Sequence, residues 1–247
     1  MSDESGTTMS TSRFVGCTLL ILAICLLVAT PQWMIMCLFA WDAMVYTVAC
    51  FFLSFALLAI IHMFEPLKYA RPWNYIVIAV CYELLTLGSA SFLMEWNLIC
   101  TIIVLAMALL FLVIVLLICA LLIWSGLYAN PFKMAVVGVM GFVLAFCIEI
   151  MDILEHWYFW QDVAVGVFIC SVIIVIISHV LITYNNIELL VRDDALLVAL
   201  VLYIAYLLFL VSGRVSLFYI RENAYYFATT TPMTYDAEED DEEHKRK

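Results

Sequence analysis

Long apolar runs separated by short polar stretches are the dominant pattern between about residue 14 and residue 213. The runs are continuous and about 17 to 28 residues long, which is the length that an α-helix needs to cross a bilayer. A transmembrane β-barrel would instead show alternating segments of about ten residues. The pattern therefore predicts an all-α polytopic membrane protein.

The polar breaks between the runs predict seven transmembrane helices. Pro31 is expected to end the first helix, and Pro72 and Asn130-Pro131 are expected to precede the third and the fifth. The expected helices cover about 14–30, 34–61, 74–94, 98–124, 134–153, 161–184 and 195–213. The chain is thus divided into a cytosolic segment (1–13), a seven-helix domain (14–213) and a polar, acidic tail (214–247) that we expect to be disordered.

Composition agrees with a membrane-embedded chain. Hydrophobic residues make up 67% and charged residues 13%, whereas a soluble domain has about a quarter charged residues. The net charge of −11 comes partly from the tail, since residues 236–247 hold seven acids and three bases. A chain this acidic is a poor partner for nucleic acid. We expect its partners to be the lipid bilayer and other membrane proteins.

The distribution of lysine and arginine predicts the orientation. One set of alternate helix ends holds bases, namely Arg13, Lys68, Arg71, Lys133 and Arg192. The other set holds acids and no base. Basic loops stay in the cytosol. The N-terminus is therefore expected to be cytosolic, and seven crossings would place the C-terminus on the opposite side. Arg214, Arg221 and the terminal Lys-Arg-Lys argue against this side for the C-terminus, so the alternatives are that these bases are translocated or that one segment does not fully cross.

Cysteine and tryptophan are both interpreted as membrane-adapted residues rather than as a site. The nine cysteines lie within or at the edge of apolar runs without a C-x-x-C pair, so we expect small buried hydrophobes. The tryptophans fall at predicted helix ends, as in an aromatic belt at the membrane surface. They are Trp33, Trp41, Trp73, Trp96, Trp124, Trp157 and Trp160.

Ionisable and amide side chains at membrane depth are candidates for an ion or proton pathway, because such groups are costly in hydrocarbon. Glu83 stands in the third run, His179 lies deep in the sixth, and Asn185 and Asn186 follow near its cytosolic end. Glu83 could bind a cation or exchange a proton, and His179 could be its partner. The alternative is that these side chains only hold helices together or cap them.

Two further polar groups lie at helix ends. Arg192, Asp193 and Asp194 form the loop before the last run. Glu149, Asp152 and His156 share one face of a helix end, because they recur at i, i+3 and i+7. Such a rim could attract a divalent cation weakly, or it could simply be hydrated. We expect no resident metal or cofactor, with Ca²⁺ only as a possible permeant ion. No motif of an enzyme is present in the sequence.

Two stretches resemble the Bax-inhibitor-type, or lifeguard, family of membrane proteins. RPWNYIVIAVCYELLTLG (71–88) is similar to the start of that family's third helix. ITYNNIELL, RDD and VALVLYIAYLLFL (182–210) are similar to its C-terminal signature of sixth helix, acidic loop and last helix. The resemblance covers about Arg13 to Arg214. It implies a seven-helix bundle and a role in calcium homeostasis and apoptosis regulation.

The departures from the family pattern concern its gate. The resemblance implies an aspartate in the sixth helix and another in the seventh, which share a proton and control a calcium leak. Asn185 and Ala205 stand at those positions. Two close carboxylates cannot both ionise cheaply and so sense pH, whereas asparagine and alanine cannot titrate. The resemblance therefore predicts a kept scaffold whose proton-sharing gate is lost.

Three function classes follow from these observations. The first is a lifeguard-type regulator of calcium leak or survival in an endomembrane, the ER or Golgi rather than the plasma membrane. The second is a non-conducting scaffold or interaction protein with the same fold. The third, a seven-helix receptor, is disfavoured because Asp-Arg-Tyr-like and Asn-Pro-x-x-Tyr motifs are missing from the expected helices.

Overall fold

The computed structural model describes residues 10–39, 44–64, 70, 72–90, 98–155, 159–190 and 194–230, and these are almost entirely helical. The helices are α1 (Thr11–Phe39), α2 (Met44–Met63), α4 (Trp73–Ala90), α5 (Leu98–Ser125), α6 (Pro131–Glu155), α7 (Phe159–Asn185), the short 3₁₀ helix η1 (Ile187–Leu189) and α8 (Asp194–Thr230). The described residues contain no strand. The expected all-α class is confirmed.

Six of the described helices are long and apolar enough to span a membrane, by length and composition. The six spans are Thr11–Met36, Trp73–Ala90, Ile99–Ser125, Pro131–Met151, Asp162–Asn185 and Asp194–Gly213. A shorter apolar helix, Tyr46–Ile61, lies within α2. The chain is therefore an integral, multi-pass helical membrane protein.

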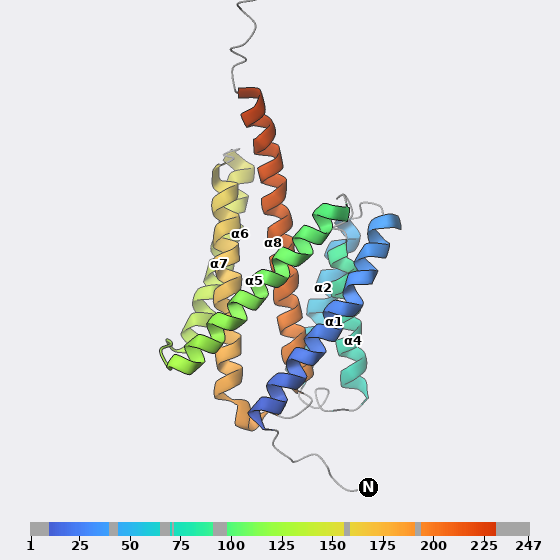
Figure 1. Cartoon of the computed structure of the whole chain (residues 1–247), viewed down its shortest axis with the longest axis vertical. Coiled ribbons are helices and arrows are strands. Elements are labelled where there is room, and N and C mark those ends of the chain that lie inside the picture. The colour runs from blue at the N-terminus through green and yellow to red at the C-terminus, as the bar shows by residue number, and fades with distance from the viewer. Residues whose placement is uncertain are drawn as a thin grey trace, which may run out of the picture. The chain divides into compact units, whose positions relative to one another are not determined.

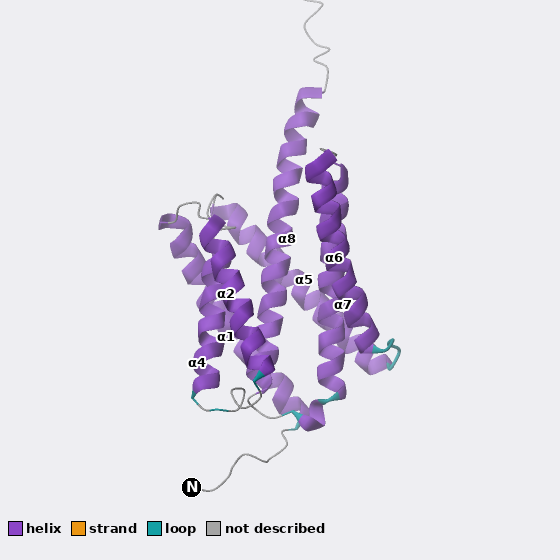
Figure 2. Cartoon of the chain, turned by 180° about the vertical axis from the view of Figure 1, so that it is seen from behind, coloured by secondary structure: helices purple, strands orange, loops and turns teal. Residues whose placement is uncertain are grey.

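Residues 1–214 form one unit of the chain, and residues 215–247 form a second one. Within the first unit, the initial part of α8 lies between the α6–α7 pair on one side and α1, α2 and α4 on the other (Figures 1 and 2). It is the most buried span, with 67% of Asp194–Gly213 inside the protein against 11% of Pro131–Met151. The last helix of the bundle therefore forms its core.

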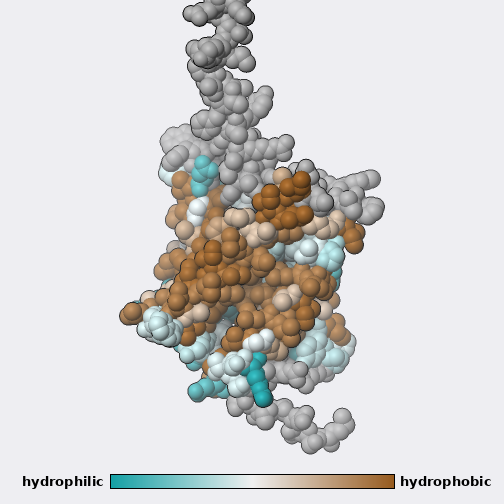
Figure 3. All heavy atoms as spheres, in the orientation of Figure 1, coloured by the Kyte–Doolittle hydropathy of each residue, from teal (hydrophilic) through white to brown (hydrophobic). Residues whose placement is uncertain are grey.

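The outer surface of the first unit is apolar. Figure 3 shows hydrophobic residues covering the middle of the face that α5 and α1 cross. Large aliphatic side chains of these two helices are exposed, for example Leu27 of α1 at 75% and Leu117 of α5 at 59%. A surface of this kind suits hydrocarbon as its surrounding medium, because no polar cover is needed against lipid.

Two glycines let α6 and α7 approach closely. A Cβ added to Gly138 would lie 2.5 Å from Cγ2 of Val175 and 3.2 Å from its backbone nitrogen. A Cβ added to Gly141 would overlap the Ser171 side chain. Small residues at such a spacing allow helix backbones to pack tightly in membranes, where van der Waals contact drives association.

The helix ends between α5 and α6 follow local rules. Gly126 takes φ +66°, a left-handed conformation that favours glycine, and its N–H donates to Leu122 at 3.0 Å. The Asn130 side chain then accepts from the Phe132 N–H at 3.0 Å, and Pro131 occupies the first turn of α6. Asn130-Pro131 thus precedes a helix as expected, although α6 begins three residues earlier than 134.

The predicted break at Pro31 is wrong. Pro31 lies inside α1, which continues to Phe39, so residues 34–39 belong to the first helix and α2 begins only at Met44. Proline is tolerated within membrane helices, where hydroxyl side chains and neighbouring helices satisfy the freed backbone groups. The carbonyl that loses its helical donor to Pro31 is that of Leu27; the Thr30 hydroxyl donates to the preceding carbonyl, that of Leu26, at 2.8 Å.

The last helix is longer than expected. α8 continues to Thr230, past the expected end at 213. Residues 231–247 of the expected tail lie outside the described residues. The residues after 213 include charged ones that the hydropathy pattern excludes from a membrane span, but such residues are compatible with a helical backbone outside hydrocarbon.

Candidate functional site

Hydroxyl and aromatic side chains from α1, α4 and α8 meet inside the bundle and form what we call the buried cluster: Trp33, Tyr82, Thr86, Ser89, Tyr203 and Tyr206. Trp33, Thr86, Ser89 and Tyr203 are each 0% exposed, and Tyr206 is 4% exposed. These side chains come from positions 33 to 206, so only the tertiary fold brings them together.

Thr86 is the centre of the hydrogen bonding in the buried cluster. Its hydroxyl donates to the Tyr82 carbonyl at 2.8 Å and lies 2.7 Å from the Tyr203 hydroxyl. Because a hydroxyl has one proton to donate, the Tyr203 hydroxyl is the donor in the second bond. α4 and α8 are thereby joined at a fully buried point.

Trp33 joins α1 to α4 at Thr86 and Ser89. Its indole N–H donates to the Thr86 carbonyl at 2.9 Å and to the Ser89 hydroxyl oxygen at 3.1 Å. Ser89 in turn donates to the Thr86 carbonyl at 2.9 Å. In hydrocarbon an unpaired polar group costs several kcal/mol, and these bonds remove that cost.

Two tyrosine hydroxyls extend the connections to the neighbouring backbones. Tyr82 donates to the Cys25 carbonyl of α1 at 2.7 Å, and Tyr206 donates to the Leu105 carbonyl of α5 at 3.3 Å. The rings also pack on one another. Trp33 and Tyr206 stack with centroids 6.0 Å apart, and Tyr82 and Tyr203 lie 5.0 Å apart. Four helices are therefore tied together by aromatic groups.

The chemistry available to the buried cluster is limited. Its side chains are hydroxyls and an indole, which are neutral near pH 7 and donate or accept hydrogen bonds. None of the six is a carboxylate or an imidazole. The arrangement can lock helices against one another and fill the interior, but it offers no acid and base pair for proton transfer.

Glu83 lies one residue beyond Tyr82, yet its side chain is exposed rather than directed into the buried cluster. Its carboxylate accepts a hydrogen bond of 3.4 Å from the Gln32 side chain of α1. Ile76, Ala79 and Val80 share its face of α4 and are also exposed. The acid thus lies on an exposed, largely apolar face of the candidate span Trp73–Ala90.

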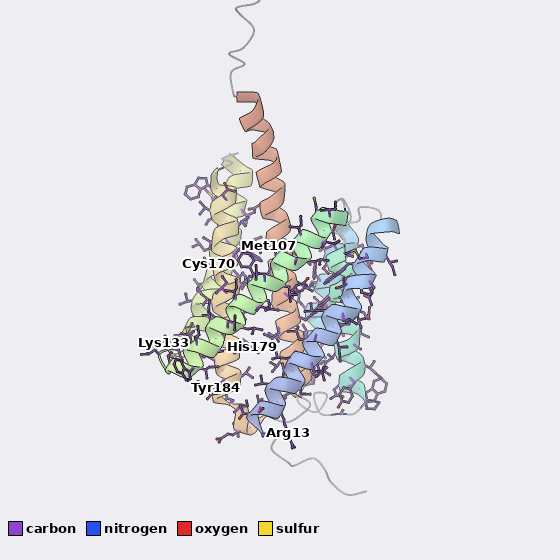
Figure 4. The ribbon with its side chains drawn as sticks, viewed as in Figure 1. Arg13, Met107, Lys133, Cys170, His179 and Tyr184 are labelled. Atoms are coloured by element: carbon purple, nitrogen blue, oxygen red, sulfur yellow. The ribbon has the colours of Figure 1, made fainter. Side chains whose placement is uncertain are left out.

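His179 is half-buried on α7, one and a half turns before Tyr184 (Figure 4). The Glu83 carboxylate accepts its hydrogen bond from the Gln32 side chain. The pairing of Glu83 with His179 that the sequence allowed therefore stays a prediction.

Asn185 and Asn186, at the end of α7, both make hydrogen bonds through their side chains. The exposed Asn185 accepts a hydrogen bond from the Tyr128 hydroxyl at 3.1 Å, which connects α7 to the segment between α5 and α6. Asn186 donates to the Ile182 carbonyl at 2.9 Å. Ala205, the other position at which the resemblance implies an aspartate, is 4% exposed on α8.

The charged loop and the acidic rim are described only in part. Asp194 is buried in the first turn of α8, where the helix dipole favours an acid, while Arg192 and Asp193 lie outside the described residues. Glu149 is half-buried on α6. The Asp152 side chain and the whole of His156 lie outside the description. Among the described residues no group of three or more His, Cys, Asp or Glu could hold a metal ion.

Trp33 corrects the predicted aromatic belt. It is fully buried and hydrogen-bonded, because α1 does not end at Pro31 and carries it into the bundle. Trp73, Trp124 and Trp160 are exposed at helix ends, at 61%, 87% and 37%, as the belt requires. Trp41, Trp96 and Trp157 lie outside the described residues.

The cysteines follow the expectation only in part. Cys50, Cys81 and Cys119 are buried, Cys17, Cys25 and Cys100 are half-buried, and Cys147 and Cys170 are exposed. Cys81 shows the buried type, since its thiol lies 3.7 Å from the Ser54 carbonyl between α4 and α2. The exposed pair sits on apolar helix faces, where lipid can cover a small hydrophobe as well as protein can.

Sequence reasoning missed the buried cluster because hydroxyl and aromatic residues are common in membrane helices. A signal does exist. Thr86 and Ser89 are three residues apart, as are Tyr203 and Tyr206, so each pair occupies one helix face.

Comparisons with protein-family models, with curated proteins and with solved structures give no significant match to this chain.

Proposed function

We propose that this protein is a multi-pass membrane scaffold of the lifeguard type that acts through contacts with other membrane proteins and carries no proton-controlled calcium leak. The observation that carries the proposal is the buried cluster. Trp33, Thr86 and Tyr203 fill the interior between α1, α4 and α8 and satisfy one another's hydrogen bonds. An ion at this level would have to break bonds that hydrocarbon makes costly to lose.

The proposal includes α2 as a seventh span. At 20 residues α2 is about 30 Å long, which is close to the thickness of the bilayer core. Its apolar stretch, Tyr46–Ile61, packs beside α4, where Cys50 lies 3.0 Å from the position of a Cβ on Gly88. Seven spans are the number that the lifeguard resemblance implies. An endomembrane location, the ER or Golgi, belongs to the same proposal.

The outer face around Glu83 supports a role in association. An acid exposed to hydrocarbon is expensive, and a partner helix with a donor side chain would lower that cost. Ile76, Ala79 and Val80 offer the apolar surface that such a helix would need. Substitution of Glu83 by Gln should therefore weaken co-purification of membrane partners, whereas Leu117→Val, on the lipid face of α5, should not.

Calcium flux into liposomes tests the absence of a proton-controlled leak. We expect the purified wild-type protein to give only background flux at both pH 6 and pH 8, because Asn185 and Ala205 cannot share a proton. A lifeguard protein with both aspartates serves as the positive control. A strong pH dependence that Asn185→Ala abolishes would overturn the proposal.

A calcium leak that uses Glu83 is the second candidate. It is favoured by the Glu83–Gln32 pair, since a carboxylate and an amide oxygen are the ligands that Ca²⁺ prefers. Under this alternative wild-type protein leaks calcium and Glu83→Gln does not. If neither protein leaks while the positive control does, the scaffold is retained and the leak is rejected.

A further inference from the structure

An apolar cavity of about 130 Å³ lies between α1, α5, α7 and α8. Its lining includes Phe14, Leu19, Leu116, Val180, Val198 and Leu202. The hydroxyl of Thr18, which also lines it, donates to the Phe14 carbonyl of its own helix at 3.0 Å and so offers the cavity no free proton. A dry cavity of roughly 150 Å³ with such a wall binds benzene-sized apolar groups. The wall therefore selects hydrocarbon.

The cavity has a mouth on the bundle surface. Val15 and Leu19 of α1 line it and are 46% and 45% exposed, and Tyr184 of α7 lines it and is 40% exposed. Aliphatic side chains at a mouth that faces hydrocarbon allow an acyl chain to enter sideways from the bilayer. Most of the lining is aliphatic, and Thr18, Thr183 and Tyr184 are its only polar side chains, so a water-soluble ligand would find little to replace its hydration.

A basic side chain, that of Arg13, lies at the end of α1 that lines the cavity. The exposed Arg13 directly precedes Phe14 and Val15, which both line the cavity. Figure 4 shows Arg13 and Tyr184 at the same end of the bundle, with Lys133 there as well. A guanidinium on the residue that precedes two lining residues suits the phosphate of a phospholipid whose chain occupies the cavity.

We propose that this cavity is a phospholipid site, which holds part of one acyl chain between α1, α5, α7 and α8 while the lipid phosphate binds Arg13. The site is independent of ion conduction and of the scaffold role. It makes the cytosolic end of α1 a point where the protein holds an individual lipid rather than only a solvating layer.

The test uses full-length protein in phosphatidylcholine nanodiscs that contain a trace of phospholipid with a photoreactive acyl chain. After irradiation, peptide mass spectrometry locates the adducts. We expect labelling of the lining residues Leu116, Val180 and Leu202. Adducts confined to outward residues such as Leu20 and Leu117 would indicate bulk lipid only and would overturn the proposal.

Cavity-filling variants give the second arm. Val180→Phe should abolish labelling of the lining residues. The matched control Leu117→Phe, next to Leu116 but facing outward, should leave that labelling unchanged. If Val180→Phe does not fold, Leu19→Trp at the exposed mouth should block entry with less disturbance. Unchanged labelling in the folded blocking variants would refute the site.

The role of the phosphate is tested with Arg13→Gln. It should reduce labelling by the phospholipid about fivefold, the effect of one base near the membrane surface. Arg13→Lys should restore most of the labelling. A photoreactive diacylglycerol with the same chain but no phosphate should label wild type and Arg13→Gln equally. Equal phospholipid labelling of wild type and Arg13→Gln would show that Arg13 does not bind the phosphate.

Discussion

Thr86 is the residue on which the buried cluster depends most, because its side chain and carbonyl serve three helices. Its hydroxyl binds Tyr82 and Tyr203, and its carbonyl accepts from Trp33 and Ser89. A side chain with this number of partners at 0% exposure should be sensitive to small chemical changes.

Thr86→Val keeps the shape of the side chain and removes the hydroxyl. The Tyr203 hydroxyl then loses its buried acceptor, and we expect a loss of about 1 to 3 kcal/mol in the free energy of unfolding. Thermal unfolding in detergent, or denaturation by a graded detergent mixture, measures the change. Thr30→Val is the matched control. Its hydroxyl is exposed and bonded only within α1, so a change of about 0.5 kcal/mol or less is expected.

The double variant Thr86→Val with Tyr203→Phe separates a lost bond from lost packing. Removal of both partners leaves no orphaned hydroxyl, so the double variant should be more stable than Thr86→Val alone. Additive losses would mean that the two hydroxyls do not interact.

At single residues, the sequence predicted the environment correctly where a side chain lies at an exposed helix end. Trp73 and Trp124 sit at helix ends and are exposed, as an aromatic belt requires. The prediction for Trp33 was wrong because the environment of this side chain depends on whether α1 continues through Pro31. The packing of the neighbouring helices decides that. Glu83 lies within the candidate span Trp73–Ala90, and its exposure on the outside depends on the rotation of α4 in the bundle.

At the scale of elements, the α6–α7 pair shows that two helix backbones can come close together where one of them carries glycine. Gly138 and Gly141 face Val175 and Ser171 so closely that no Cβ fits without movement. Gly166, on α7, has no atom within 4 Å of a Cβ position.

These two environments predict opposite outcomes for the same substitution. Gly138→Ala should lower the melting temperature, because the Val175 side chain and backbone leave no room and overpacking costs about 1 to 3 kcal/mol. Gly166→Ala should be neutral or stabilising, by up to about 1 kcal/mol from helix propensity. Equal effects of the two alanines in thermal unfolding would contradict the close approach of α6 and α7.

Element boundaries were predictable where a local signal acts alone. Gly126 after α5 and Asn130-Pro131 before α6 both follow capping rules that need no tertiary contact. The rule for Pro31 failed since it describes helices in water. Within a membrane bundle the helix continues through a proline when other groups compensate for the lost donor.

At the scale of the whole molecule, the span count determines on which side each terminus lies. Seven spans put the termini on opposite sides of the membrane, whereas six put them on the same side. We expect a protease added to sealed endomembrane vesicles to remove a tag at the N-terminus and to leave a tag at the C-terminus intact until the vesicles are opened. Removal of both tags from sealed vesicles would mean that one apolar helix does not cross.

The sequence by itself determined that this is an all-helical membrane protein and, within a few residues, where most of its apolar helices lie. The reason is that hydrocarbon demands long apolar runs with internally satisfied backbones, and such runs are visible without any fold. Only the tertiary structure decided which helix forms the core and which polar groups meet. Those features depend on how the helices rotate and pack. In a bilayer an apolar side chain can face a neighbouring helix or the surrounding lipid at similar free-energy cost. The buried cluster of Trp33, Thr86 and Tyr203 therefore emerged from the packing of α1, α4 and α8, and not from any one of their sequences.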